Sequence, residues 1–151
     1  MEAFRELGFK LEEEEGMGYC FNYEGLNLLY MYNENDEEFL NIALPGIVDV
    51  EEDKMLQICA LLEKINSTLK YIKAYMLGNS VWLFYERELF GEEDLMTVIS
   101  RMILHLEAGL SFARKAMTEI EETMTNDSSD DDTAESAEEI DAEEITDDDN
   151  E

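Results

Sequence analysis

Few side chains in this sequence could carry out chemistry, and they lie apart from one another. His105 is the only histidine, and it lies in a stretch of helical periodicity with no HxxxH or HxH pattern and no cysteine near it. A general base or a metal ligand needs partner groups that converge on one site. We therefore expect His105 to have an ordinary structural role on a helix face.

The two cysteines, Cys20 and Cys59, are also isolated, without a CxxC pattern or a neighbouring histidine. A nucleophilic thiol needs a lowered pKa and an activating base. Cys20 falls in the middle of a predicted strand, and Cys59 falls on the apolar stripe of a predicted helix. We therefore predict two small, buried hydrophobic side chains in a reducing compartment.

Carboxylates are too numerous for any pair of them to indicate a site, because 39 residues are acidic. Residues 12–15, 51–53 and 92–94 could each be an acid–base pair or a cation site, but a solvated turn and helix starts explain them more simply. Residues 130–132 lack the spacing, the glycine and the closing glutamate of an EF-hand loop. The sequence also has no phosphate-binding loop and no GxSxG motif. We therefore predict no enzyme, no catalytic residue, no cofactor and no metal site.

The net charge of −29 limits the classes of partner. Such a chain repels nucleic-acid phosphates and anionic lipids, so we expect neither a nucleic acid nor a membrane among its partners. No stretch approaches the roughly 18 consecutive apolar residues of a membrane span. The first residues lack the basic and apolar regions of a signal peptide, so we expect a cytoplasmic protein.

Composition changes abruptly after Met124. In residues 126–151, 14 residues are acidic and none is basic or aromatic. Such a segment cannot bury enough apolar surface to offset its chain entropy. We therefore predict a folded domain over residues 1–125 and a disordered acidic tail over residues 126–151, and we expect deletion of the tail to leave folding intact. A near repeat at 137–140 and 142–145 is interpreted as a solubilising segment, a motif for a basic groove, or a competitor for the domain's own binding surface.

The periodicity of apolar residues predicts an α+β fold for the domain. A short helix over residues 1–7 ends at Gly8, a residue that suits a helix C-cap. A brief strand at 9–11 and a charged turn at 12–16 precede an antiparallel meander that Pro45 and Gly46 close. The strands of the meander are predicted at residues 19–23, 26–32 and 39–44.

A helix and a hairpin follow the meander. Asp49 and Glu52 fit a capping box, so we predict a helix that begins there. After this helix the period returns to two, and Gly78 and Asn79 form a hairpin turn. The strands of the hairpin are predicted at residues 71–77 and 81–85, the second of them apolar on both sides and therefore central in the sheet.

The last element is a long helix, predicted over residues 92–124 and about 50 Å in length at 1.5 Å per residue. Because this length exceeds the width of such a domain, the helix must pack on a second chain, break near Gly109, or fray. Met117, Ile120 and Met124 have little domain beside them to pack on, so we predict that they contact a protein partner. The sheet supplies a second candidate surface in its tyrosines, and we choose three of them as predicted contact residues: Tyr71, Tyr75 and Tyr85.

The order helix, three-stranded meander, helix, two-stranded hairpin, long helix resembles the YbjN family, whose fold is shared with the type III secretion chaperones. The segments FRELGF (4–9) and YCFNYEG (19–25) carry the resemblance, together with LNIALP (40–45) and VWLFYE (81–86). It covers roughly residues 1–124. The resemblance implies an α+β fold, often homodimeric, that presents sheet and helix surfaces to an extended protein segment.

Two functions from different classes follow. The first is a non-catalytic, chaperone-like or regulatory protein-binding module that forms a homodimer through its last helix and binds an extended, basic or amphipathic protein segment. The alternative is an acidic mimic of nucleic acid that inhibits a DNA- or RNA-binding protein. Affinity for the partner should collapse with added salt in the second case and persist in the first.

Overall fold

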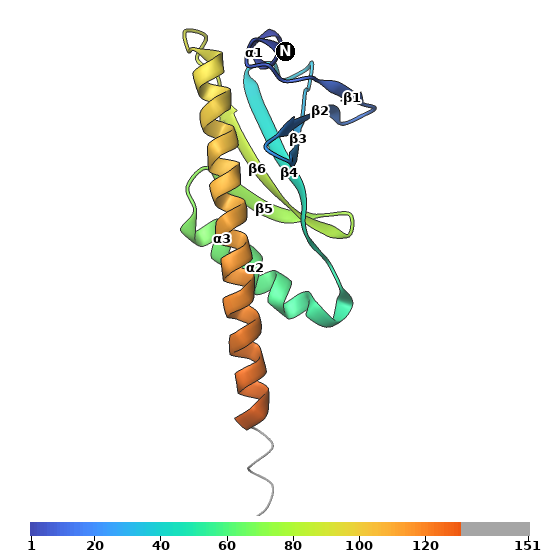
Figure 1. Cartoon of the computed structure of the whole chain (residues 1–151), viewed down its shortest axis with the longest axis vertical. Coiled ribbons are helices and arrows are strands. Elements are labelled where there is room, and N and C mark those ends of the chain that lie inside the picture. Colours follow the sequence, from blue (N-terminus) through green and yellow to red (C-terminus); the bar gives the residue numbers. More distant parts are fainter. Residues whose placement is uncertain (131–151) are drawn as a thin grey trace, which may run out of the picture.

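A computed structural model describes residues 1–130 of the chain. In this part of the chain, helices lie against a six-stranded antiparallel sheet, which confirms the predicted α+β fold (Figure 1). The helices are α1 (Glu2–Glu6), α2 (Met55–Thr68) and α3 (Leu95–Asp130), with one 3-10 turn, η1 (Glu52–Lys54). The strands are β1 (Glu12–Glu14), β2 (Gly18–Tyr23), β3 (Leu26–Tyr30), β4 (Phe39–Asp49), β5 (Ile72–Leu77) and β6 (Ser80–Glu88).

The strands lie in the order β1-β2-β3-β4-β6-β5, and each neighbouring pair is antiparallel. The predicted meander, β2–β3–β4, and the predicted hairpin, β5–β6, are both present. Strand β6 is paired on both sides, with β4 and β5, which confirms the central position expected from its apolar residues. Strands β1 and β5 are therefore the edges of the sheet.

The helices pack on one face of the sheet, which we call the helix-covered face (Figure 1). Alternate strand residues, such as Ile42 and Leu83, are fully buried there in one apolar cluster. Burial of each such side chain contributes about 1.5–3 kcal/mol. The helices supply the rest of the cluster, including Phe4 from α1, Ile58, Leu61 and Ile65 from α2, and Ile99, Met102, Ile103 and Leu106 from α3.

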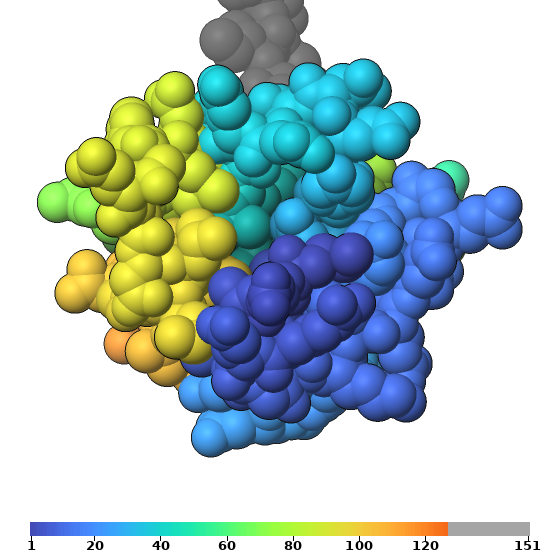
Figure 2. Space-filling model, turned by 90° about the horizontal axis from the view of Figure 1, so that it is seen from above, coloured from blue at the N-terminus to red at the C-terminus, as the bar shows by residue number. Residues whose placement is uncertain are grey.

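Aromatic contacts attach the short helix α1 to the sheet. The ring of the buried Phe4 lies 4.7 Å from the ring of Tyr30 and 5.2 Å from that of Phe21. Gly8 follows the helix with a φ of +88°, as its predicted capping role requires, and the N–H of Phe9 donates to the carbonyl of Phe4 at 3.0 Å. Helix α1 also contacts α3, so the first and last helices of the described chain are neighbours (Figure 2).

Two strand predictions were wrong. Residues 12–14, predicted as part of a charged turn, form β1, whereas residues 9–11 have no regular structure. Glutamate has a low strand propensity, but backbone pairing with β2 overrides it here. Strand β4 continues through Pro45 to Asp49. Its register shifts between Leu44 and Val48, and such an irregularity tolerates a proline, which has no N–H to donate.

Two predicted helix starts were also wrong. Asp49 lies in β4, and α2 begins after η1 without a side-chain cap, so the predicted capping box is absent. Helix α3 begins later than predicted because Asp94 caps it. One carboxylate oxygen of Asp94 accepts a hydrogen bond from the N–H of Met96 at 3.2 Å, and the other accepts one from the hydroxyl of Thr97 at 2.5 Å.

Helix α3 continues without a break through Gly109, so, of the three alternatives for its excess length, the break is excluded. A Cβ atom at Gly109 would lie 3.3 Å from Cδ1 of Leu83, which shows that this glycine lets the helix approach the sheet closely. The helix has 36 residues, or about 54 Å at 1.5 Å per residue. It extends past residue 125 into the segment predicted as the tail, and the remainder of that prediction, 131–151, lies outside the described residues.

Within the described residues, α3 is also long and apolar enough to cross a membrane by length and composition, because an 18-residue stretch of it has a mean hydropathy of 1.3. The core helix of a folded domain meets the same condition. One side of α3, from Val98 to Ala116, has this position in the cluster on the helix-covered face, and a third of the apolar stretch is buried.

Candidate protein-binding surface

No helix of the described chain packs on the second face of the sheet, which we call the helix-free face. A row of paired residues crosses it. Cys20 on β2 pairs with Leu29 on β3, which pairs with Ala43 on β4. Ala43 pairs with Phe84 on β6, and Phe84 pairs with Lys73 on β5. The central three residues of the row are at most 2% exposed, so this face has a small apolar core of its own.

Aromatic and methionine side chains cover the centre of the helix-free face. The ring of Phe84 lies 4.1 Å from that of Tyr75, nearly parallel to it, and 6.0 Å from that of Trp82. Met17 and Met31 pack against the same cluster. Methionine side chains are unbranched and polarizable, so they adapt to partners of different shape. The helix-free face is therefore an apolar surface of large, partly exposed side chains.

Both edges of the sheet carry features that disfavour pairing with another strand. At β5, the side-chain amide of Asn66 donates to the carbonyl of Ala74 and accepts from its N–H, both at 2.8 Å. These are main-chain groups that an added strand would use. At the opposite edge, β1 consists of three exposed glutamates. The sheet therefore offers its helix-free face to a partner more readily than its edges.

The three tyrosines predicted as contact residues lie on opposite sides of the sheet. Tyr75 lies on the helix-free face and is 41% exposed. Tyr71 and Tyr85 stack on the other side, with ring centroids 5.6 Å apart, and both lie edge-on to His105 of α3. Tyr85 is buried and Tyr71 is 63% exposed. Only Tyr71 and Tyr75 are accessible to a partner, and they belong to two different surfaces.

The stacked tyrosines line a cleft of about 580 Å³ at the start of α3. Arg87 forms an ion pair with Glu93 inside it, and Arg101 also lines it. Burial raises the pKa of Tyr85, and the charge of Arg87 opposes part of that increase. Nδ1 of His105 lies 2.7 Å from the carbonyl oxygen of Arg101, one helical turn earlier. The contacts of His105 are thus aromatic rings and helix backbone, which agrees with a structural role.

The contact residues predicted on the second half of α3 pack partly within the protein itself. Met117, Ile120 and Met124 are each half-buried. Met117 and Ile120 pack against the main apolar cluster, so the expectation that they have little domain beside them was wrong. Their contact with a partner stays a prediction.

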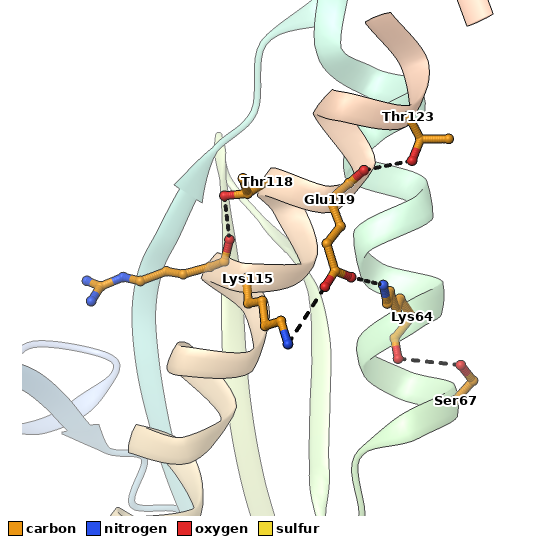
Figure 3. Close-up of polar contacts among 7 residues, drawn as sticks. Lys64, Ser67, Lys115, Thr118, Glu119 and Thr123 are labelled. Carbon is orange, nitrogen blue, oxygen red and sulfur yellow. Dashed lines mark hydrogen bonds and ion pairs between the residues drawn. The ribbon is translucent and has the colours of Figure 1, made fainter. Parts of the chain in front are cut away.

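Polar contacts attach this part of α3 to α2 (Figure 3). The carboxylate of Glu119 lies 2.7 Å from Nζ of Lys64 on α2 and 3.9 Å from Nζ of Lys115 on α3. The hydrogen bond from Lys64, and then its charge, lower the pKa of the Glu119 carboxyl. Because all three side chains are substantially exposed, these pairs orient the helix more than they stabilise the fold.

The two cysteines differ from the prediction and from each other. Cys59 is exposed, so the expectation of a buried thiol was wrong for this residue. Cys20 is half-buried on the helix-free face, where desolvation, followed by the charges of Glu14 and Glu12, raises the pKa of its thiol. A raised pKa is the opposite of what a nucleophilic cysteine requires. In the described residues, no group of three His, Cys, Asp or Glu side chains could hold a metal ion.

A polar pocket, which the sequence analysis missed, lies on the helix-free face where β4 begins and β6 ends. It has a volume of about 490 Å³, and we call it the Asn41 pocket. Nδ2 of Asn41 donates to Oε1 of Glu86 at 3.1 Å, whereas Oδ1 is buried and has no hydrogen-bond partner among the described residues. Asn41 is the one polar residue in the apolar run 40–44, and this interruption was a signal for the pocket. Its other walls include Met17, Met31, Asp36 and Phe39.

No protein-family model matches the sequence, and no curated protein matches it. The structure is similar to the crystal structure of "YbjN, a putative transcription regulator from E. coli". The TM-score is 0.55 with 14% sequence identity, over 74% of this chain and 83% of that chain. The fold is YbjN-like. At this identity the similarity shows the fold alone, so membership of the YbjN family stays a prediction.

The predicted order of helices and strands is confirmed by the structure. The description of the neighbour names no catalytic activity. The two accessible tyrosines lie on two surfaces of this fold, Tyr75 on the helix-free face and Tyr71 at the cleft near the start of α3. Both surfaces consist of aromatic, apolar and charged side chains.

Proposed function

We propose that this chain is a non-catalytic protein-binding module, chaperone-like or regulatory, that holds an extended, basic or amphipathic protein segment on its helix-free face. The observation that carries the proposal is the apolar row from Cys20 to Phe84, which crosses the sheet with no described helix over it. Partly exposed aromatic side chains on such a surface are typical of protein contacts. The YbjN-like fold supports a non-catalytic, regulatory function, because its neighbour is described as "a putative transcription regulator".

The mode of binding that fits this sheet is packing on its face. Addition of a strand at β5 would have to displace Asn66 from Ala74, and addition at β1 would meet three glutamates. Packing on the face leaves both edges intact. It also buries Tyr75 and Trp82, which are now partly exposed, and apolar burial of this kind persists in salt.

Charge around the helix-free face favours a basic segment. Glu14 lies close enough to Cys20, at one end of the row, for its charge to raise the pKa of that thiol, whereas Glu12 beside it forms an ion pair with Lys10. Asp36 and Glu86 line the Asn41 pocket at the side of the same face. A cationic segment would approach this surface faster than a neutral one, and its affinity would depend in part on ionic strength.

We also propose that the chain forms a homodimer through α3. Exposed apolar side chains on this helix include Leu95, Met96 and Leu104, and Leu104 is 52% exposed. A long helix that continues past the rest of the domain can pair with its counterpart in a second chain. The helix-free face is on the other side of the sheet, so such a dimer leaves it open.

A display library of random 12-residue peptides tests the proposal. Peptides enriched on the wild-type protein are then measured against Tyr75→Glu and Tyr71→Glu, which make the same change on opposite sides of the sheet. We expect Tyr75→Glu to weaken binding at least tenfold and Tyr71→Glu to leave it nearly unchanged. Trp82 is the only tryptophan and lies on the helix-free face, so its fluorescence reports the same event without a label.

The opposite result, with loss of binding only in Tyr71→Glu, would place the peptide in the cleft beside His105 and overturn the proposed surface. Failure of the wild-type protein to enrich any peptide above an empty support would overturn the protein-binding function. The unfolding transition of each variant in urea provides the folding control, because Tyr75 stacks on Phe84 and its loss removes that contact.

A further inference from the structure

We propose that the Asn41 pocket binds the side chain of one lysine or arginine of the partner segment. This inference rests on the proposed function and specifies the chemistry of the partner. The pocket combines a buried acceptor without a partner, two carboxylates and apolar walls, and none of the described residues that line it is basic.

The acceptor is Oδ1 of Asn41. Because Nδ2 of the same amide is engaged by Glu86, the amide cannot rotate to reverse its ends without losing that hydrogen bond. A buried carbonyl oxygen without a donor is unfavourable, and a ligand that supplies a donor removes this penalty. An ammonium or guanidinium group brings several donors and no acceptor, so it suits a site with a buried oxygen acceptor and two carboxylates.

Two carboxylates give the pocket its charge preference. Glu86 contributes Oε1, which already accepts from Asn41, while its Oε2 forms an ion pair with Lys73 at 2.7 Å. Lys73 itself does not line the pocket, and its side chain is 64% exposed. Asp36 lines the pocket and forms no ion pair with a described residue. A cation in the pocket would therefore meet one unpaired carboxylate and one that it shares with Lys73.

The apolar walls suit the hydrocarbon part of the same side chain. Met17, Met31 and Phe39 line the pocket together with the polar groups. Lysine and arginine have long aliphatic stems that pack on apolar surface while their charged ends reach polar groups. Oδ1 of Asn41 is covered in the described conformation, and the unbranched methionines that line the pocket can change rotamer to admit the head group.

The surface next to the Asn41 pocket extends the preference for basic residues to the rest of the partner segment. A second groove of about 450 Å³ shares Gly16, Met17, Tyr32 and Asn33 with the Asn41 pocket, so the two are adjacent. Glutamates line this second groove, at positions 13, 14 and 34. A segment anchored by one basic side chain would thus pass from the apolar helix-free face onto an acidic surface.

The first test places a competing charge at the mouth of the pocket. Phe39 is 49% exposed there, and Phe90, at 73% exposure in the loop before α3, is the matched control. Phe39→Lys and Phe90→Lys change the net charge of the protein equally. We expect peptides selected on the wild-type protein to contain a lysine or arginine at one fixed position. Phe39→Lys should lower the affinity of these peptides at least tenfold more than Phe90→Lys does.

The second test removes the acceptor and the charge separately. Replacement of the fixed lysine in a selected peptide by norleucine keeps the aliphatic stem and removes the ammonium group, and we expect at least tenfold weaker binding to the wild-type protein. In Asn41→Leu this difference between the two peptides should fall below threefold. Asn27→Leu, the same substitution elsewhere on the helix-free face, should retain it. If Asn41→Leu fails to fold, the comparison of Phe39→Lys with Phe90→Lys still tests whether the Asn41 pocket binds the basic side chain.

The outcomes separate this inference from the proposed function. Selected peptides that bind the helix-free face with no fixed basic residue, or that lose equal affinity in Phe39→Lys and Phe90→Lys, overturn the pocket and leave the protein-binding function standing. The absence of any selected peptide overturns both. A basic preference that Asn41→Leu leaves unchanged also overturns the pocket, because the charge is then recognised elsewhere.

Discussion

Asn66 and Ala74, eight residues apart in the chain, are joined by two hydrogen bonds of 2.8 Å between the amide of Asn66 and both main-chain groups of Ala74. The amide presents a donor and an acceptor side by side, as the main chain of a neighbouring strand would. Asn66 lies in the last turn of α2, and Ala74 lies in the middle of β5. The end of a helix thus substitutes for a seventh strand at the edge of the sheet.

We predict that Asn66→Ala lowers the free energy of unfolding by about 1–3 kcal/mol, because two hydrogen bonds to partly buried main-chain groups are lost. The same change exposes the edge of β5, so self-association should increase. Urea denaturation measures the first effect, and light scattering at increasing protein concentration measures the second. Ser67→Ala is the matched control, since the hydroxyl of the exposed Ser67 makes only a 3.4 Å contact with a helix carbonyl. Equal stability and equal scattering of the two variants would contradict the prediction.

Gly109 gives a prediction about packing between α3 and the sheet. We expect Gly109→Val to lower the free energy of unfolding by about 1–3 kcal/mol, because a side chain there would press on Leu83 and Ile72. Ala108→Val places the same residue at a neighbouring, exposed position, where it lowers helix propensity by less than about 1 kcal/mol, whereas Gly109→Val raises it, so a larger loss at Gly109 comes from packing. Thermal or urea denaturation compares the two. If Ala108→Val proved the more destabilising change, the close approach at Gly109 would not be tight.

Period-two alternation was enough to predict β2 and β5 from the sequence, and β6 was predicted from residues that are apolar on both sides. Alternation was not enough for β1, whose three glutamates carry no apolar pattern and pair through the backbone with β2. Nor could it identify the open face. In β6, Leu83 and Phe84 point to opposite faces and are equally buried, one under helices and the other under Tyr75 and Trp82. Which apolar face a helix covers depends on the path of the chain after the strand, and a local pattern does not encode that path.

Local sequence patterns were also insufficient to predict the candidate binding surfaces. The sequence predicted the tyrosines as one aromatic surface, yet Tyr71 has a φ of +69°. This conformation, unusual for a tyrosine, precedes β5, and Tyr71 lies with Tyr85 and His105 on the side opposite to Tyr75. Cys59 was expected in the core because it recurs at helical spacing, but its position on α2 is at the exposed border of that stripe. The period of the apolar residues shows which side of a helix is buried, but it does not show how wide the buried stripe is.

The two thiols should differ in reactivity with pH. The pKa of Cys20 is raised by desolvation and by nearby glutamates, so its thiolate fraction at pH 8 is lower than that of an ordinary thiol and increases only as the pH rises further. We predict that iodoacetamide labels the exposed Cys59 several-fold faster than Cys20 at pH 8, and that Cys20 labelling accelerates above this pH. Mass spectrometry of timed samples gives both rates. Faster labelling of Cys20 at pH 8 would contradict the assigned environment. A peptide on the helix-free face should slow Cys20 alone.

The proposed dimer predicts a specific mutational result. We expect Leu104→Glu to convert the dimer to a monomer, because it places a charge on the exposed apolar side of α3. Leu56→Glu is the matched control on α2, where Leu56 is 71% exposed. Light scattering coupled to size-exclusion chromatography, in low and high salt, measures the mass of each variant. A wild-type monomer would exclude the dimer, and equal dissociation by both changes would exclude α3 as its specific interface.

The main apolar cluster joins Phe4, near the beginning of the chain, to residues of α3 as late as Ala116. A ribosome makes the N-terminal part first, so Ile42 and Leu83 are synthesised well before the helix that covers them. We expect one apolar face of the sheet to stay exposed to solvent in the nascent chain until α3 has emerged from the ribosome. The domain should therefore fold only after α3 has been synthesised. A protein arranged in this way is vulnerable to aggregation as an incomplete chain, and its last helix is the step that ends that vulnerability.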